Sequence, residues 1–290
     1  MSDDEPRRTI LDILTLQETA PDRFTAPTPA EGPPRLFGGQ VAAQALRAAC
    51  ATVEAGRPVH SLHSYFIRPG RPDAVMELAV ERTRTGRSFT TRHVTALQED
   101  KAIFTLTASF HAPEEGTDWQ LPGPEAIGPS VAPAAAEGEP GHPLATFWRD
   151  SPFLLQPLSG STQRPLLHPA WVRLAEEIGD DPVLHACALT YVSDMAVVFA
   201  ARAPSDRGLG LGLAAASLDH SVWFHRPFDV RQWLLFSVDA VSNYGARGLA
   251  LGTFHTEDGT RVASIAQEGL LRSTGGPTWP STPPTEGPDR

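Results

Sequence analysis

The heptapeptide HSYFIRP, at residues 63–69, returns one residue longer as HSVWFHRP at residues 220–227. The first histidines of the two copies are 157 residues apart. Further along the chain, Gly86-Arg87 and Ala246-Arg247 each precede a stretch with the pattern of a long β-hairpin. Similar segments that follow one another in the same order indicate an internal repeat, so the chain is predicted to contain two copies of one structural unit.

Each copy combines one helix with several strands. Small apolar residues at helical spacing predict a helix that continues to residue 53, and Asp181 before Pro182 marks the start of a second helix that ends near residue 200. Alternating patterns predict strands at 61–68, 74–84, 88–98 and 102–111, and again at 170–174, 213–227, 232–243, 247–256 and 261–271. A helix wrapped by a curved antiparallel sheet is the hotdog architecture. Two copies therefore predict an α+β fold, a double hotdog.

Composition divides the chain further. We expect an N-terminal hotdog repeat at 1–112 and a C-terminal hotdog repeat at 166–272. Between them, residues 113–165 are rich in Pro, Gly and Ala and are predicted to form a linker. Residues 273–290 have the composition of a disordered tail.

The overall charge and the few cysteines exclude several classes of protein. The 290 residues include 24 Lys plus Arg against 34 Asp plus Glu, a formal net charge of −10, so no nucleic-acid partner is expected. Two cysteines without CxxC spacing exclude a disulfide scaffold and a cysteine-rich metal site. No apolar run approaches the roughly 20 residues that span a bilayer, and the N-terminus lacks the pattern of a secretory signal. We expect a cytoplasmic protein that does not act at a membrane.

Two polar residues interrupt apolar surfaces in the second copy. Asp194 falls in the apolar stripe of the second predicted helix, together with Cys187 and Tyr191. Gln267 shares a face of the last predicted strand with Ile265. A buried carboxylate is costly unless it is hydrogen-bonded, which favours a catalytic group in a cleft. For Asp194, the alternatives are an exposed helix end or a hydrogen bond to a local backbone group. For Gln267, the alternative is pairing with the backbone at a strand end.

Ser217, in the small-residue run before the second motif, is the third polar residue of interest. The offset of 157 matches Ser217 with His60, and the position along the last strand matches Gln267 with Ala108. The polar set is therefore complete only in the second copy. His60 and His63 are alternative candidates for a general base. The chain has no GxSxG, P-loop or HExxH motif, and no metal site or cofactor is expected.

A family resemblance rests on six segments, which are LFGGQVAAQAL (36–46), VHSLHSYFIRPG (59–70), RSFTTRHVTALQ (87–98), SDMAV (193–197), SLDHSVWFHRPF (217–228) and VASIAQEGLLR (262–272). In these segments the chain closely resembles the TesB-like acyl-CoA thioesterases, also called the acyl-CoA thioesterase II family. The similarity covers roughly residues 8–112 and 166–272. It implies the double hotdog fold and the hydrolysis of acyl-CoA to a free fatty acid and CoA.

The resemblance also implies roles for individual residues. The family's Asp, hydroxyl and Gln match Asp194, Ser217 and Gln267, with Ser where the best-known members have Thr. These residues would orient a water molecule, with Asp194 as general base. Backbone N–H groups of Gly38-Gly39-Gln40 are candidates for stabilising the oxyanion, because a helix N-terminus favours negative charge.

Substrate contacts and assembly follow less directly from the sequence. Candidates for the CoA phosphates are Arg68, Arg87, Arg226 and Arg247, although a structural or solvated role fits each of them. Hotdog sheets associate edge to edge, so we expect a homodimer or a higher homo-oligomer.

Two alternative functions stay open at this point. One is a non-catalytic acyl-CoA-binding protein. The other is a hotdog acyl-CoA hydratase, which is disfavoured because the sole asparagine, Asn243, sits at a strand end with no suitably spaced His.

Overall fold

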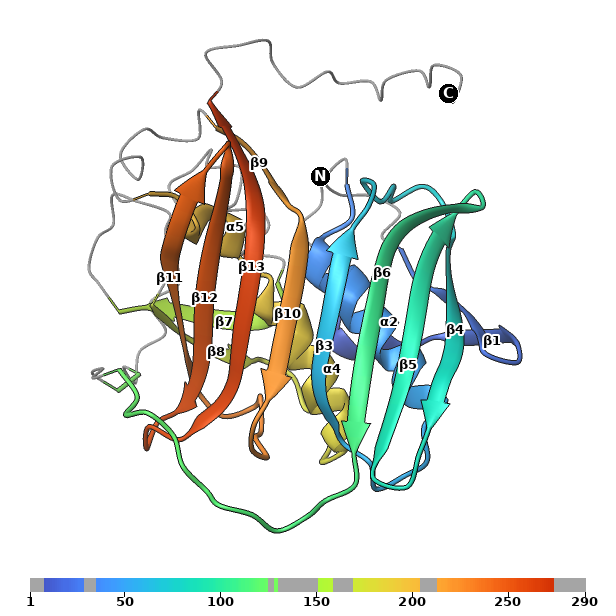
Figure 1. Ribbon diagram of the computed structural model, residues 1–290, viewed down its shortest axis with the longest axis horizontal. Helices are drawn as coiled ribbons and strands as arrows, with labels where there is room; N and C mark the ends of the chain where they lie inside the picture. The colour runs from blue at the N-terminus through green and yellow to red at the C-terminus, as the bar shows by residue number, and fades with distance from the viewer. Residues whose placement is uncertain are drawn as a thin grey trace.

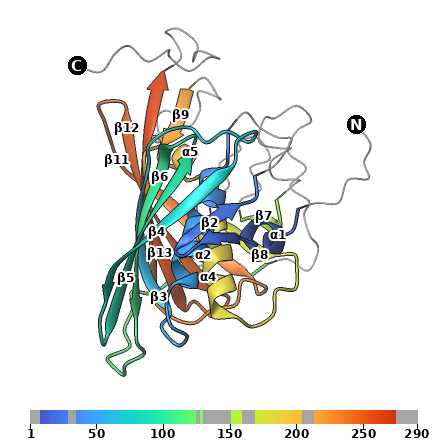
Figure 2. The ribbon, with the colours of Figure 1, turned by 90° about the vertical axis from the view of Figure 1, so that its right-hand side faces the viewer.

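Two helices lie side by side against one face of a single curved antiparallel sheet (Figures 1 and 2). This computed structural model describes residues 8–28, 35–124, 128–129, 151–158, 169–203 and 213–273. The helices are α1 (Ile10–Leu14), α2 (Gly38–Ala51), α4 (Pro182–Ser193) and α5 (Val197–Ala200). The long α2 and α4 pack against each other and against the sheet, and each belongs to one repeat. The arrangement is the predicted α+β double hotdog.

The strands follow the repeat. The first half contributes β1 (Gln17–Ala20), β2 (Arg23–Ala26), β3 (Val59–Phe66), β4 (Met76–Thr85), β5 (Phe89–Gln98) and β6 (Lys101–His111). The second half contributes β7 (Phe153–Pro157), β8 (Ala170–Leu174), β9 (Leu213–Ser217), β10 (Asp219–Phe224), β11 (Leu234–Tyr244), β12 (Arg247–Thr256) and β13 (Arg261–Ser273). The order across the sheet is β1-β2-β4-β5-β6-β3-β10-β13-β12-β11-β8-β7. Strand β9 pairs with the C-terminal end of β13, at residues 269–273.

The two halves join where β3 pairs with β10, the two strands that carry the repeated motif. In this antiparallel pairing His63 lies opposite Ser221, and Ser64 lies opposite His220. His63 and Ser221 point outward and contact each other, with His63 Nδ1 3.1 Å from Ser221 Oγ. Ser64 and His220 point inward and are buried. The pseudo-two-fold axis that relates the two halves therefore passes beside the His63–Ser221 pair.

This pairing corrects the offset of 157 residues. His63 is exposed whereas His220 is fully buried, so these two residues lie on opposite faces of the sheet and are not equivalent. A shift of one residue changes the face of every side chain in a strand. The offset that keeps the faces is 158, as in the Phe66–Phe224 pair. It matches Leu62 with His220, and it matches Ser217 with Val59 rather than with His60.

Small residues allow the two central helices to approach closely. In α2 the alanines 42, 43, 45, 48 and 49 are fully buried. At its first turn, a Cβ on Gly39 would lie 2.2 Å from the carbonyl oxygen of Tyr191 in α4. The beginning of α2 is thus in backbone contact with the last turn of α4, and only glycine fits at that point.

Three predicted boundaries differ from the structure. The second helix does not run to residue 200 but ends at Ser193, because Ala196 has a left-handed backbone conformation (φ 59°) before α5 begins. The strand predicted at 213–227 is divided at Leu218 into β9 and β10. Part of the predicted linker at 113–165 forms β7, which pairs with β8. The predicted tail lies outside the described residues beyond Ser273. Within the described ranges, no helix is long and apolar enough to cross a bilayer.

Gly39→Ala tests the backbone contact between α2 and α4. Because the added Cβ meets a carbonyl oxygen rather than a flexible side chain, the helices must separate, and we expect a loss of about 1–3 kcal/mol in the free energy of unfolding. Denaturant unfolding measures it. Gly116→Ala is the control, since a Cβ there meets nothing within 4 Å. Equal stability of the two variants would contradict the contact.

Candidate active site

Asp194 lies at the point where the second long helix ends. It is the C-cap residue of α4, and only 6% of its surface is exposed. The sequence pattern is compatible with Asp194 either at an exposed helix end or in a buried cleft. The structure places it at a helix end that is buried. The C-terminus of a helix disfavours a negative charge, so a carboxylate there needs other partners.

Three groups approach the Asp194 carboxylate. Ser217 Oγ, at the end of β9, lies 3.5 Å from Asp194 Oδ1 and is oriented to donate to it. Gln267 of β13 donates from Nε2 to Ser217 Oγ at 2.8 Å, and its side chain also donates to the carboxylate. The backbone N–H of Gly39 is the third donor. The structure thus brings together the three residues singled out in the sequence, and it adds the first turn of α2 from the other half.

Burial dominates the electrostatics of this group. Desolvation raises the pKa of Asp194 to about 7, while the hydrogen bonds from Gln267, Gly39 and Ser217 act in the opposite direction. An acid with a pKa near neutrality can hold or release a proton at physiological pH. This is the property expected of a general base.

A largely apolar cavity of about 560 Å³ opens above the carboxylate. Both halves of the chain line it, with Phe37, Phe66 and Phe104 from the first and Phe199 from the second. Asp194 and Ser217 form part of its wall. A Cβ on Gly38 would lie 2.7 Å from both Asp194 Oδ2 and the Phe66 ring, so glycine is needed where α2 faces the cavity. The cavity offers an apolar side chain or acyl group direct access to a buried carboxylate.

The predicted oxyanion donors at the start of α2 are largely occupied. Gly39 N–H donates to Asp194 itself, and Gln40 N–H donates to the carbonyl oxygen of Phe37 at 3.1 Å. Gln40 also sends its side-chain amide to Pro27 O. Gly38, which lines the cavity, is the member of this group that faces the space a ligand would occupy.

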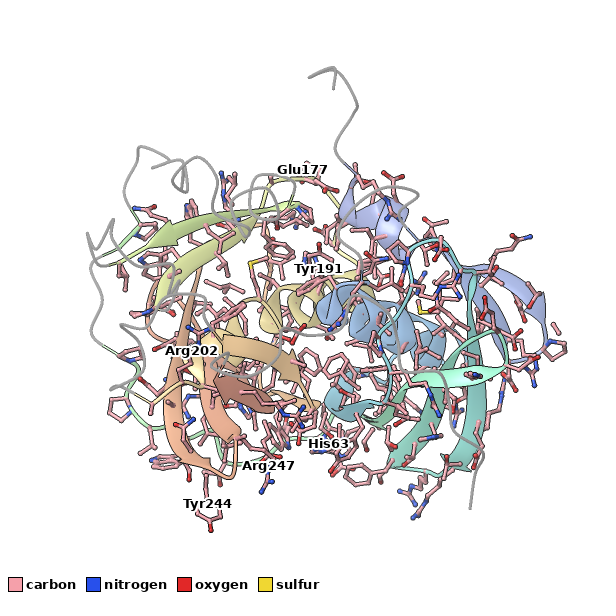
Figure 3. The ribbon with its side chains drawn as sticks, turned by 90° about the horizontal axis from the view of Figure 1, so that it is seen from above. His63, Glu177, Tyr191, Arg202, Tyr244 and Arg247 are labelled. Atoms are coloured by element: carbon pink, nitrogen blue, oxygen red, sulfur yellow. The ribbon has the colours of Figure 1, made fainter. Side chains whose placement is uncertain are left out.

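The two alternative bases, His60 and His63, are not part of this site. His60 Nε2 contacts Ser109 Oγ at 2.8 Å, and the ring of His63 packs on the partly exposed Trp223. Figure 3 shows His63 on the side of the sheet that faces away from the helices. The sheet therefore separates both imidazoles from Asp194.

Of the four arginines considered for CoA, only Arg68 lines the cavity, where Arg35 joins it. Arg68 also donates to the carbonyl oxygen of Ala102. Arg87 is exposed in the turn between β4 and β5. Arg247 pairs with Glu268 at 2.9 Å, and Arg226 pairs with Asp118.

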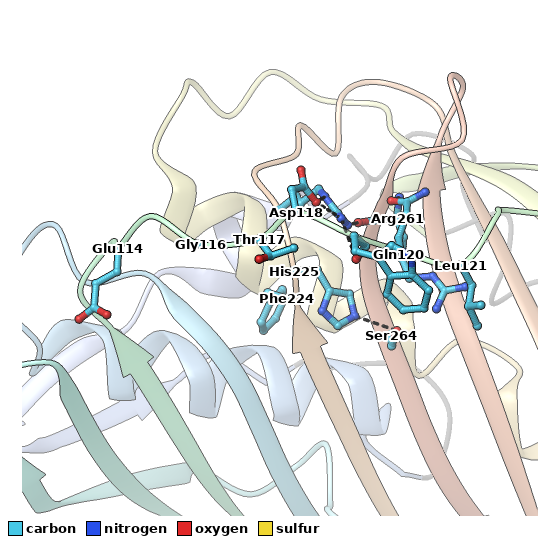
Figure 4. A pocket seen from close by; sticks show the side chains of 12 residues that line it. Glu114, Gly116, Thr117, Asp118, Gln120, Leu121, Phe224, His225, Arg261 and Ser264 are labelled. Carbon is cyan, nitrogen blue, oxygen red and sulfur yellow. Dashed lines mark hydrogen bonds and ion pairs between the residues drawn. The ribbon is translucent and has the colours of Figure 1, made fainter.

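Arg226 belongs to a second hollow, of about 630 Å³, on the outer face of the sheet (Figure 4). The segment that follows β6 passes there along the end of β10 and the β12–β13 hairpin (Figure 1). It is held by the Asp118–Arg226 ion pair and by Gln120, which donates to Gly259 O and accepts from Arg261 N–H. These contacts fasten the start of the predicted linker to the second half.

Among the described residues of the first half, the polar set has no equivalent. Its helix α2 is capped at the C-terminus by Thr52, which corresponds to Asp194. Opposite Ala108, the equivalent of Gln267, stands Arg92, whereas Ala250 stands opposite Gln267.

The guanidinium of Arg92 fills the corresponding space in the first half. It is only 2% exposed and donates to Thr52 Oγ1 at 2.8 Å and to Thr52 O at 3.0 Å. Further bonds to Arg84 O, Thr91 O and Thr85 Oγ1 satisfy its remaining donors. In the first half the large residue of the pair, Arg92, is on β5 and the small one, Ala108, is on β6. In the second half the small residue, Ala250, is on β12 and the large one, Gln267, is on β13.

His220 and Ser193 are not among the site residues predicted from the sequence, yet His220 lies beside Gln267 and Ser193 directly precedes Asp194. His220 Nε2 is 2.7 Å from Ser193 Oγ, and both residues are fully buried. The signal was present in the repeated motif. With an offset of 157, the buried His220 is matched with the exposed His63, so the motif does not show that His220 faces the core.

Comparison with known proteins gives the same family over both halves. The family model described as "Acyl-CoA thioesterase N-terminal domain" matches residues 25–111, and the model "Acyl-CoA thioesterase" matches residues 146–270. Among curated proteins, Acyl-CoA thioesterase 2 of Haemophilus influenzae is 35% identical over 252 residues, which cover 82% of this chain and 88% of that protein. Acyl-coenzyme A thioesterase 8 of Homo sapiens is 34% identical over 265 residues, covering 82% and 81%.

Solved structures agree. The crystal structure of an acyl-CoA thioesterase II, TesB2, from Mycobacterium marinum has a TM-score of 0.76 at 34% identity and covers 93% of this chain and 99% of that chain. A tesB protein from Mycobacterium avium subs paratuberculosis has a TM-score of 0.74 at 31% identity, covering 90% and 98%.

The raised pKa of Asp194 predicts a pH-dependent stability. Between pH 4 and 7 an unfolded Asp ionises while the native one stays protonated, so the wild type loses stability as the pH rises. Asp194→Asn does not titrate, and its stability relative to wild type should increase over this range by up to about 4 kcal/mol. Denaturant unfolding at pH 4, 5.5 and 8 measures the difference. Asp100→Asn, at an exposed turn, controls for the loss of one charge. A difference between Asp194→Asn and wild type that does not change with pH would contradict the buried carboxyl.

Proposed function

Because this chain belongs to the acyl-CoA thioesterase family and hydrolyses acyl-CoA thioesters, we propose that Asp194, Ser217 and Gln267 hold and activate the attacking water. One observation carries the proposal: a buried carboxylate, with hydroxyl, amide and backbone donors converging on it, stands in the wall of an apolar cavity. Hydrolysis of a thioester needs a positioned water, a base for its proton and donors for the oxyanion.

In the proposed reaction, the water lies between the Asp194 carboxylate and the thioester carbonyl carbon. Its oxygen attacks that carbon while a proton passes to Asp194, and negative charge develops on the carbonyl oxygen. Collapse of the tetrahedral intermediate breaks the C–S bond. The CoA thiolate leaves and takes up the proton from Asp194, which restores the carboxylate. Ser217 and Gln267 fix the water and the carboxylate relative to each other.

The cavity suggests how the substrate lies. Its phenylalanines, Phe37, Phe66, Phe104 and Phe199, offer an apolar lining for the acyl chain. The two arginines on its wall, Arg35 and Arg68, offer positive charge for the phosphates of CoA. Gly38 N–H, at the positive end of α2, is the proposed oxyanion donor. Neither a metal nor a covalent intermediate takes part in the proposed reaction, and a homodimer or a higher homo-oligomer stays our prediction for the assembly.

Thiol release from a panel of acyl-CoA substrates tests the assignment of Asp194. Loss of a positioned general base should lower the kcat of Asp194→Asn by about 10²–10⁴-fold. Asp219→Asn is the matched control. Asp219 accepts a hydrogen bond from Glu268 N–H, which an amide oxygen can also accept, and Asp219 does not line the cavity. Full activity in Asp194→Asn would leave the thioesterase activity intact but overturn this mechanism.

The pH profile gives a second test of the base. Since the carboxylate is the active form, kcat/KM should rise with pH up to about 7 and stay level above it. The rise should be absent from the residual activity of Asp194→Asn. A wild-type profile that is level from pH 5 to 8 would exclude a base with this pKa.

A further inference from the structure

His220 is a buried imidazole that touches the proposed catalytic set from behind. The register of β10 with β13, in which Ser221 faces Ala266, places His220 beside Gln267 on the inner face of the sheet. On its other side, His220 Nε2 is 2.7 Å from the hydroxyl of Ser193, the residue before Asp194. His220 does not line the cavity. It therefore contacts the neighbours of the reacting groups and not the substrate.

The first half shows that the fold itself does not need a histidine here. With the offset of 158, the equivalent of His220 is Leu62. Ala108 faces Leu62 across β3 and β6, in the place that Gln267 takes beside His220. Leu62 and Ala108 are both fully buried and apolar. An apolar pair thus serves the packing of one half, and the polar pair occurs only in the half that holds the carboxylate. A buried polar pair in place of a leucine and an alanine calls for a role beyond packing.

The hydrogen-bonding capacity of the network selects one arrangement of protons. Among the described residues, His220 Nδ1 and Gln267 Oε1 are both buried and have no hydrogen bond of good geometry. The Gln267 side chain nevertheless acts on the imidazole as a hydrogen-bond partner. If Nδ1 carries the proton, it donates to Gln267 Oε1, and both atoms are satisfied. Nε2 then accepts from the Ser193 hydroxyl, whose alternative acceptor is Thr190 O at 2.9 Å.

The orientation of an amide decides what Gln267 presents to the site. With Oε1 held by His220, Nε2 points to Ser217 Oγ and to Asp194. The reversed amide would direct its oxygen at a carboxylate, where two acceptors repel each other. Burial lowers the pKa of His220 to about 4, so the imidazole stays neutral and one nitrogen alone carries the proton.

We propose that His220 is a positioning residue for thioester hydrolysis, an inference that rests on the proposed function. Its Nδ1–H donates to Gln267 Oε1, so that the Gln267 amide nitrogen faces Ser217 and Asp194. Ser193 fixes the tautomer by donating to Nε2. His220 thus acts through Gln267 on the orientation of the water and the carboxylate.

Two conservative variants distinguish the role of Nδ1 of His220 from that of Nε2. The side-chain amide of Asn can place an N–H close to the position of Nδ1, and that of Gln can reach the position of Nε2. We therefore expect His220→Asn to keep kcat within about threefold, and His220→Gln to lower it by about tenfold or more with KM unchanged. His93→Gln, at a histidine that contacts Thr107 on another strand, is the matched control. Equal losses in His220→Asn and His220→Gln would overturn the proposal.

A double-mutant cycle shows whether His220 acts through Gln267. In a Gln267→Ala background, His220→Gln should change kcat by less than about twofold, because its target is absent. An undiminished loss in that background would indicate a merely structural role and overturn the proposal. If Gln267→Ala alone retains full activity, the proposed function of Gln267 fails instead, and the cycle distinguishes the two failures.

The tautomer is measurable in the wild-type protein, independently of activity and of variants that fail to fold. The ¹⁵N chemical shifts of the imidazole nitrogens report which one carries the proton. We expect His220 to be protonated at Nδ1 at pH 7. Protonation at Nε2 would mean that Nδ1 cannot donate to Gln267, and would overturn the proposal.

Discussion

The pairing of β3 with β10 determines the rest of the molecule. It joins two half-sheets through the repeated motif, with His63 opposite Ser221 at the pseudo-two-fold position. Since each half-sheet carries its own helix, this junction also sets α2 beside α4. The beginning of one helix then meets the end of the other, and the buried carboxylate lies where they meet. A change of register at this single junction would move the inward-facing residues of one half to the outer face.

At the helix junction, two opposing effects set the chemistry. Burial at the C-terminus of α4 disfavours a negative charge on Asp194, whereas the hydrogen bonds from Gln267, from Gly39 N–H at the N-terminus of α2 and from Ser217 favour it. Together they give Asp194 a pKa of about 7. Because the glycines of α2 allow this approach, a helix from one repeat tunes an acid that belongs to the other. The site is therefore a property of the whole double hotdog, although its polar side chains come from the second half.

Periodic features could be predicted from the sequence, and local breaks could not. Helical spacing and strand alternation located α2, α4 and the long hairpins, and Asp194 and Gln267 stood out because they interrupt apolar faces. The end of α4 escaped prediction because it depends on Ala196, whose left-handed conformation has no signal in an alanine. The predicted offset between the repeats was wrong by one residue, because His63 and His220 are the same residue type but lie on opposite faces of the sheet. Arg92 was missed because a buried arginine looks like any surface arginine until its partners are known.

The exchange of Arg92 and Ala108 for Ala250 and Gln267 has a consequence for how such a site can evolve. In a symmetric pair of identical subunits, every substitution occurs twice, so an arginine that plugs one pocket would plug both and abolish turnover. Fusion of the two units in one polypeptide removes that restriction. One pocket can then be filled by a hydrogen-bonded core, while the pocket of the other half keeps the destabilising buried acid. Asymmetry between duplicated halves thus divides stability and activity between two regions of the same chain.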